Sequence, residues 1–233
     1  MKKYLVCEHK NIFILLMTGA GMMGAYTFNV RGGVFCNAQT ANIVMMGIAL
    51  GNGKLSDGLY YLIPIAAYCL GAFVSEALPS AVKKLGLFRW DTWLVAFEML
   101  ILFIIGFIPL ELPHQIVQVT INFIASMQYN TFRQAEGIPM ATTFCTNHVR
   151  QVGIALAKLL CKHDTEAVKR GWSHAQMLLG FLCGGMLLTL VCRFFPRQSI
   201  WVALLPLAAV LFQLAYADIV LERGRLDQTP GGH

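Results

Sequence analysis

Six long apolar stretches, separated by polar connections, constrain this chain more than any other feature of its sequence. They cover residues 12–30, 58–78, 92–110, 115–133, 174–193 and 199–217. A helix needs about 20 apolar residues to cross the roughly 30 Å hydrocarbon core of a bilayer. Of the 233 residues, 57% are hydrophobic and only 13% are charged, against about 25% charged residues in a soluble domain. We therefore predict an all-α integral membrane protein.

Two further stretches, residues 34–51 and 138–160, are apolar but carry polar side chains near their starts. As full spans they would give eight crossings, and as broken or re-entrant segments they would leave six. With six crossings, only Arg31, Lys54, Arg193 and Arg197 of the 18 basic residues lie on the side opposite the N-terminus. Eight crossings would nearly remove this bias. Because basic residues gather on the cytoplasmic side, we predict six spans with both termini in the cytoplasm.

The chain is too short for a membrane bundle and a sizeable soluble domain together. We expect a single transmembrane domain over residues 1–218 and a polar tail over residues 219–233. Residues 12–28 are too long for a signal peptide and lack a clear A-x-A site. The first apolar stretch is therefore predicted to be an uncleaved helix, in a multi-pass protein of the bacterial cytoplasmic (inner) membrane.

The two halves of the chain share short motifs in the same order. Thr27-Phe28 recurs as Thr131-Phe132, Asn42 as Asn147, and the run Gly-Ile-Ala-Leu at 47–50 as 153–156. Small residues also recur, at Ala67/Gly71 and Gly180/Gly184. We interpret residues 12–111 and 115–218 as two copies. Three spans per copy would invert the second copy, a plan found in transporters whose helices are broken near the midplane.

The run GVFCNAQTANIVMMGIALGNG, preceded by GAGMMGAYTF, resembles the signature of the YoaK-type family of small bacterial membrane proteins of unknown function. The run MQYNTFRQAEGIPMATTFCTNHVRQVG resembles that family's second half, so the resemblance covers nearly the whole chain. The matching positions are Asn37, Thr40, Asn42, Gly47, Thr146 and Asn147. Two positions depart from the pattern. Ala41 replaces the glycine of T-G-N, and Gly24 replaces the acidic residue of G-x-x-D-A. The resemblance implies no particular activity.

Amides and hydroxyls of the two polar segments are the best candidates for a substrate-binding site. Such groups replace part of the hydration shell of an ion or polar solute, and broken helix ends add a fixed dipole. The alternative is that they only cap helices and bond across the bundle. The candidates are Asn37, Gln39, Thr40, Asn42, Thr143, Thr146 and Asn147.

Two charged residues lie within apolar segments, Glu98 in the third span and Arg150 in the second polar segment. A charge inside a membrane costs about 3 kcal/mol or more, so each needs a partner or a wet cavity. A Glu98–Arg150 ion pair and a proton-coupling role for Glu98 are both open. Glu76 and Asp218 stand at helix ends, where we expect them to be solvated.

Several other classes of protein are disfavoured. His148 and His163 lack the spacing of a metal site, and the seven cysteines show no C-x-x-C motif. No cofactor fingerprint or soluble-type catalytic motif is present, so an enzyme is not expected. The formal charge of +6 is spread between spans and forms no nucleic-acid surface. We expect the lipid bilayer and a small polar solute or ion as partners, and a homodimer is open.

We therefore predict a small transporter or channel-like permease for a polar solute or ion. The alternative is a non-transporting accessory or partner-binding protein. A homodimer is consistent with the small residue pairs at Gly47/Gly51, Ala67/Gly71 and Gly180/Gly184, which allow helices to approach closely.

Overall fold

The computed structural model describes residues 4–83, 86–228 and 230. This part of the chain forms helices joined by loops, with a short antiparallel hairpin of β1 (Gln134–Ala135) and β2 (Ile138–Pro139). The prediction of an all-α membrane-type fold is confirmed in this coarse form. The α-helices are α1 (Lys10–Val30), α2 (Gln39–Gly51), α3 (Leu55–Tyr60), α4 (Leu62–Ala77), α5 (Pro79–Lys83), α6 (Trp90–Ile105), α7 (His114–Thr131), α8 (Thr146–Lys162), α9 (Thr165–Cys192) and α10 (Leu204–Tyr216).

Four helical stretches among the described residues are long and apolar enough to cross a membrane. They are Lys10–Val30, Leu55–Lys83, Thr165–Cys192 and Gln198–Leu221. The other two predicted spans correspond to α6, which has 16 residues, and to α7, which carries a row of polar side chains. Six crossings thus remain a prediction. Of the basic residues counted for topology, Lys2, Lys3 and Lys84 lie outside the described residues.

Helices of the first half of the chain pack against helices of the second half. Helix α1 packs along α9, and α7 packs along α4. A Cβ added at Gly184 of α9 would overlap the backbone carbonyl of Thr18 in α1. In the same way, a Cβ added at Gly71 of α4 would overlap the carbonyl of Phe123 in α7. Glycine is needed at both crossings because any side chain would push the two backbones apart.

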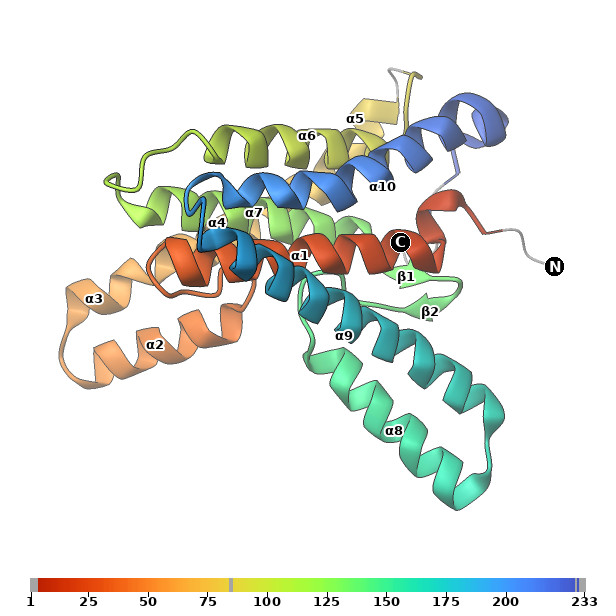
Figure 1. Cartoon of the computed structure of the whole chain (residues 1–233), viewed down its shortest axis with the longest axis horizontal. Helices are drawn as coiled ribbons and strands as arrows, with labels where there is room; N and C mark the ends of the chain where they lie inside the picture. The colour runs from red at the N-terminus through yellow and green to blue at the C-terminus, as the bar shows by residue number, and fades with distance from the viewer. Residues whose placement is uncertain (1–3, 84–85, 229, 231–233) are drawn as a thin grey trace.

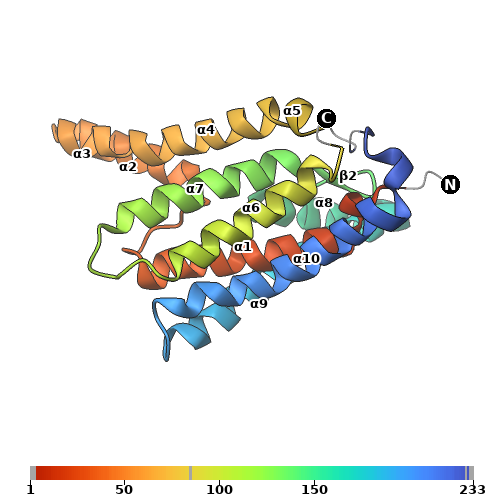
Figure 2. The ribbon, with the colours of Figure 1, turned by 90° about the horizontal axis from the view of Figure 1, so that it is seen from above.

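An apolar core lies where α1, α6, α7 and α10 run side by side (Figures 1 and 2). Its fully buried side chains include Phe13, Leu16, Leu102, Ile124 and Leu207. The Phe13 and Phe132 rings meet edge to face, with centroids 6.1 Å apart. At one end Trp201 closes this layer, because its Nε1 donates to the backbone oxygen of Phe103 at 3.0 Å.

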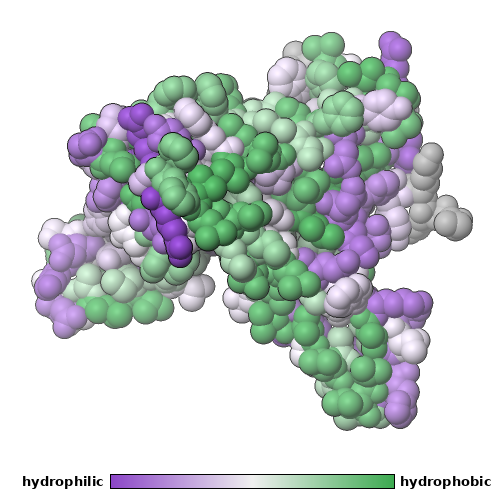
Figure 3. Space-filling model, in the orientation of Figure 1, coloured by the Kyte–Doolittle hydropathy of each residue, from purple (hydrophilic) through white to green (hydrophobic). Residues whose placement is uncertain are grey.

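Two helical hairpins project from this bundle, α2–α3 and α8–α9 (Figure 1). Apolar side chains cover most of the α8–α9 hairpin, and polar residues gather at its tip (Figure 3). On the first hairpin, the positions of Gly47 and Gly51 face open space. Of the three pairs of small residues noted in the sequence, Ala67/Gly71 and Gly180/Gly184 therefore lie at contacts between helices of this chain. The Gly47/Gly51 pair contacts no other helix among the described residues.

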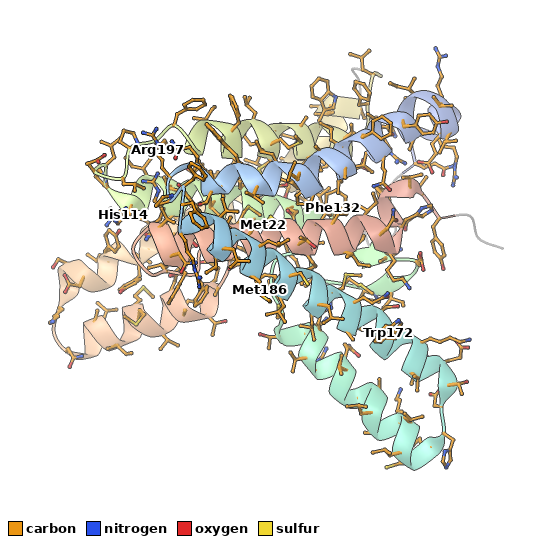
Figure 4. All side chains as sticks on the ribbon, viewed as in Figure 1. Met22, His114, Phe132, Trp172, Met186 and Arg197 are labelled. Atoms are coloured by element: carbon orange, nitrogen blue, oxygen red, sulfur yellow. The ribbon has the colours of Figure 1, made fainter. Side chains whose placement is uncertain are left out.

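Polar contacts join the loops at one end of the bundle. The side chain of Arg31 is fully buried and donates to the backbone oxygens of Ile108 at 2.6 Å and Pro109 at 2.9 Å. Its Nε also donates to the hydroxyl of Tyr26 at 3.1 Å, which in turn donates to the backbone oxygen of Arg197. Arg197 and His114 lie at this same end (Figure 4).

The first and last described segments meet at the other end. The Val6 amide donates to Glu222 at 3.0 Å, and Arg89, just before α6, contacts the same carboxylate. Glu222 is 4% exposed, so the start of the predicted polar tail packs against the body of the protein. The remainder of that tail includes residues outside the described part of the chain.

Candidate functional site

The two polar segments of the sequence meet inside the protein. Asn37, in the loop before α2, donates its Nδ2 hydrogen to the backbone oxygen of Thr143, in the loop before α8, at 2.6 Å. Asn37 is 9% exposed and Thr143 is fully buried. A buried amide and a buried carbonyl each need a partner, so this bond fixes the two loops to one another. It joins the first half of the chain to the second.

A chain of side-chain amides links α2 to α7. Asn42 Nδ2 donates to Gln39 Oε1 at 3.0 Å, and Gln39 Nε2 donates to Asn122 Oδ1 at 2.5 Å. Asn122 is 1% exposed, and its Nδ2 has no hydrogen-bond partner. A buried N–H without a partner costs about 1–3 kcal/mol. The chain of amides therefore ends on a free donor beside the first turn of α2.

A second buried amide lies beside the loop before α8. Gln128 of α7 is fully buried and donates its Nε2 hydrogen to the backbone oxygen of Thr142 at 3.1 Å. Gln128 Oε1 and the Thr142 hydroxyl have no partner. The sequence did not indicate Gln128, because it lies off the polar row of α7, in which Gln118, Asn122, Ser126 and Asn130 recur every four residues.

The remaining candidates of the polar segments do not join this contact. Thr40 and Thr146 are exposed. Asn42 bonds within α2, and Asn147 accepts a hydrogen bond from Arg150 within α8 at 2.8 Å. The link between the two segments is thus made by Asn37 and Thr143, a few residues before the two asparagines.

The two charged candidates lie in different surroundings. Both carboxylate oxygens of Glu98 are buried and without a hydrogen-bond partner. Arg150 is exposed and donates a hydrogen bond to Asn147. The expectation of a Glu98–Arg150 ion pair is therefore wrong, because the arginine points to the surface and the glutamate into the core. A proton-coupling role for Glu98 stays a prediction.

A groove of about 520 Å³ runs between α1 and α9 and ends beside the Asn37 contact. Its walls include Gly21, Gly24, Phe28, Phe35 and Phe181. A Cβ added at Gly24 would lie 3.5 Å from the amide oxygen of Asn37. The polar contact thus lies directly behind the small residues of the groove wall.

A pair of histidines that the sequence did not indicate joins α8 to α9. The Nδ1 atoms of His148 and His174 lie 2.9 Å apart, and both residues are buried. His148 Nε2 lies 2.9 Å from the backbone oxygen of Ala141 and must donate to it. Its Nδ1 therefore accepts from His174, because a neutral imidazole carries one proton. His148 and Ala155 are the two buried residues of α8 and lie seven positions apart, so they share one face of the helix.

The sequence also missed a buried ion cluster at the end of the bundle where the first and last described segments meet. Arg89 Nε lies 3.1 Å from Asp218 and 3.5 Å from Asp91, and its Nη2 lies 2.8 Å from Glu222. Thr92 also donates to Asp218 at 2.6 Å. The expectation that Asp218 is solvated is wrong, because it is 1% exposed. It bonds Arg89 and Thr92, which belong to a segment far away in the sequence.

Comparison with known proteins places the chain in a family. Residues 12–213 match a family described as Protein of unknown function (DUF1275). A search of curated proteins found no match, and neither did a search of solved structures. The match extends from the start of α1 to near the end of α10, so it includes both polar segments and the contact between them. The chain therefore belongs to the DUF1275 family of proteins of unknown function.

Proposed function

We propose that this protein is a small permease that carries a polar solute or ion across the bacterial cytoplasmic membrane. The observation that supports this most is the buried contact of Asn37 with Thr143, from opposite halves of the chain. Beside it lie polar atoms without protein partners, the Asn122 Nδ2 and the Gln128 Oε1. Such atoms are rare in a dry helix bundle, and a passing solute would satisfy them.

The proposal includes two inverted repeats, and pairs of equivalent contacts support it. Gly184 packs on the backbone of Thr18, as Gly71 packs on that of Phe123. A second pair joins the same helices. A Cβ at Gly21 of α1 would overlap the Phe181 carbonyl of α9. In the other half of the pair, the Ser126 hydroxyl of α7 donates to the Tyr68 carbonyl of α4 at 2.6 Å. The equivalent positions of α4 and α9 are then 113 residues apart, and those of α1 and α7 are 105 apart, one more than separates Thr27 from Thr131. With these two offsets each contact maps onto the other of its pair. Transporters of this plan hold their substrates where the repeats meet.

Membrane topology gives a direct test. In a variant without its native cysteines, a cysteine placed by Leu87→Cys should react with membrane-impermeant reagents only from the cytoplasmic side. A cysteine placed by Lys54→Cys should react only from the opposite side. Both native residues are exposed. Six crossings require this outcome, whereas labelling of Leu87→Cys from the outside would restore the eight-span alternative.

Solute flux tests the permease itself. Vesicles containing the purified protein should shrink and re-swell faster than empty vesicles in a panel of small polar solutes and salts, followed by light scattering. We expect Asn37→Ala to lower the rate for the transported solute about tenfold or more, since a lost buried hydrogen bond of about 1–2 kcal/mol acts together with the displaced loop.

Asn52→Ala is the matched control, because that exposed amide bonds only within its own helix end. Its flux should equal that of the native protein. Equal flux in vesicles with and without the protein, for every solute, would exclude the permease and favour the accessory role.

The accessory role is the second candidate, and the two projecting hairpins favour it. Side chains such as Leu160 at 76% and Leu55 at 64% exposure lie on these hairpins, and Gly47 and Gly51 face open space. A partner helix or a second copy of the chain would fit there, which is also the proposed site of a homodimer. Cross-linking at Gly47→Cys in native membranes distinguishes a self-contact from a contact with another protein.

A further inference from the structure

A cavity of about 470 Å³ lies where α1 and α9 begin, beside the β1–β2 hairpin. The two helices run in the same direction, because Gly180 and Gly184 of α9 pack on Ile14 and Thr18 of α1 in that order. Both belong to stretches that are long and apolar enough to cross a membrane. Since both stretches begin beside the cavity, it lies at the level of the lipid headgroups. Its charged lining residues are Lys10, Glu136, Glu166, Lys169 and Arg170.

The cavity carries more positive than negative charge. Lys169 is paired with Glu166, at 2.7 Å and three residues before it on α9. The carboxylate of Glu136, in the turn of the hairpin, accepts a hydrogen bond from the backbone N–H of Lys10 at 3.4 Å. Among the described residues, no ion pair joins the side chain of Lys10 or of Arg170 to a carboxylate. Two cationic groups are therefore available to a ligand, against one carboxylate, so the cavity favours an anion.

An apolar groove adjoins the charged cavity at Trp172, on the half of α9 nearer the hairpin tip (Figure 4). The groove has a volume of about 160 Å³, lies between α8 and α9, and is lined by apolar residues alone. The two helices approach closely there, because a Cβ added at Gly171 would overlap the Cβ of Ala155. Leu156 and Leu159 line the groove from α8 and are exposed. Trp172 is 59% exposed and borders both spaces, which is typical of tryptophan at a membrane–water interface.

We propose that the cavity and the groove together bind one anionic phospholipid of the cytoplasmic leaflet. Its phosphate accepts hydrogen bonds from the Lys10 ammonium and the Arg170 guanidinium, and one acyl chain lies in the groove beyond Trp172. Arginine and lysine are usual partners of phosphate, and basic pockets between helices on the cytoplasmic side bind anionic headgroups. The apolar groove favours a lipid over a free phosphate ion. The site is separate from the Asn37 contact, so it rests on membrane insertion and the predicted topology but not on transport.

Titration of the purified full-length protein in detergent with dioleoylphosphatidylglycerol tests the proposal, with native mass spectrometry to count bound lipids. Dioleoylphosphatidylcholine has the same acyl chains but no net charge, and we expect it to bind about tenfold more weakly. Lys10→Gln and Arg170→Gln should each lower the affinity for the anionic lipid about fivefold, and the double variant should remove the preference for it. The matched control is Lys54→Gln, which removes an exposed positive charge outside both spaces and should leave binding unchanged.

A second pair of variants tests the groove. Leu156→Gln places an amide in the groove and should weaken binding of the anionic lipid several-fold, whereas Leu160→Gln, on the same helix but outside the groove, should not. Both leucines are exposed, so both variants should melt like the native protein without lipid.

Three results would overturn the proposal. The first is equal affinity for the two lipids, or native-like binding by the double variant of Lys10 and Arg170. The second is displacement of the lipid by sodium phosphate at similar concentration, which would make the ligand a free anion. The third is a change from dimer to monomer in Leu156→Gln without a change in lipid binding, which would make the groove a contact between two copies of the chain.

Discussion

Replacing Gly184 by valine should prevent the native helix packing and cost about 3 kcal/mol or more of folding free energy. The added Cβ would overlap the backbone carbonyl of Thr18, and a backbone atom cannot rotate away as a side chain does. Helices α1 and α9 would have to separate along their length. Thermal melting and size-exclusion chromatography of the variant in detergent measure the loss.

Gly47→Val provides the matched control, since a Cβ there meets no atom within 4 Å. Its stability should stay within about 0.5 kcal/mol of the native protein, as is usual for surface positions. Gly71→Val, at the equivalent crossing of α4 with α7, should be as damaging as Gly184→Val. Native-like melting of Gly184→Val would mean that α1 and α9 do not approach as closely as described.

Replacing Arg89 by methionine should destabilise the protein by about 3–5 kcal/mol, the usual cost of removing one partner from a buried ion pair. Methionine keeps much of the side-chain volume, so the loss comes from charge rather than from a cavity. Asp91, Asp218 and Glu222 would then repel each other without a counter-ion. Unfolding in denaturant or by heat measures the effect.

The pH dependence separates this cause from a packing defect. Uncompensated buried carboxyls bind protons more tightly in the folded than in the unfolded protein. The defect of Arg89→Met should therefore shrink as the pH is lowered and grow as it rises. Arg223→Met is the control, because Arg223 lies next to Glu222 in the chain but is exposed. A defect that is the same at every pH would contradict the electrostatic explanation.

The sequence predicts the helices of this protein well because apolar length is a local property. It also predicts the role of the polar row on α7. Gln118 donates to the Arg31 carbonyl, Ser126 to the Tyr68 carbonyl, and Asn130 to Ser75. Lipid offers no partners to such groups, so the row had to face protein. This constraint acts on single helices and needs no knowledge of the neighbours.

The contacts that form the sites were harder to predict. The Arg89 amide and the Asp218 carboxylate are 129 residues apart, and both lie near helix ends, where solvation is the usual state. Asn37 and Thr143 are 106 residues apart, and the acceptor is a backbone oxygen. Every residue carries such an oxygen, so the pairing has no signature in the sequence. The recurrence of motifs between the halves indicated only that the two segments are equivalent.

The packing of the first half of the chain against the second also determines the order in which helices meet during synthesis. Helix α4 finds its partner α7 soon after it leaves the ribosome. Helix α1 must wait until most of the chain has been made, because its partner is α9. At about 5–20 residues per second, this delay lasts roughly ten seconds or more. Throughout that time the face of α1 that will meet Gly184 has no helix packed on it. Truncated chains that end before α9 should therefore be targets for membrane quality-control proteases.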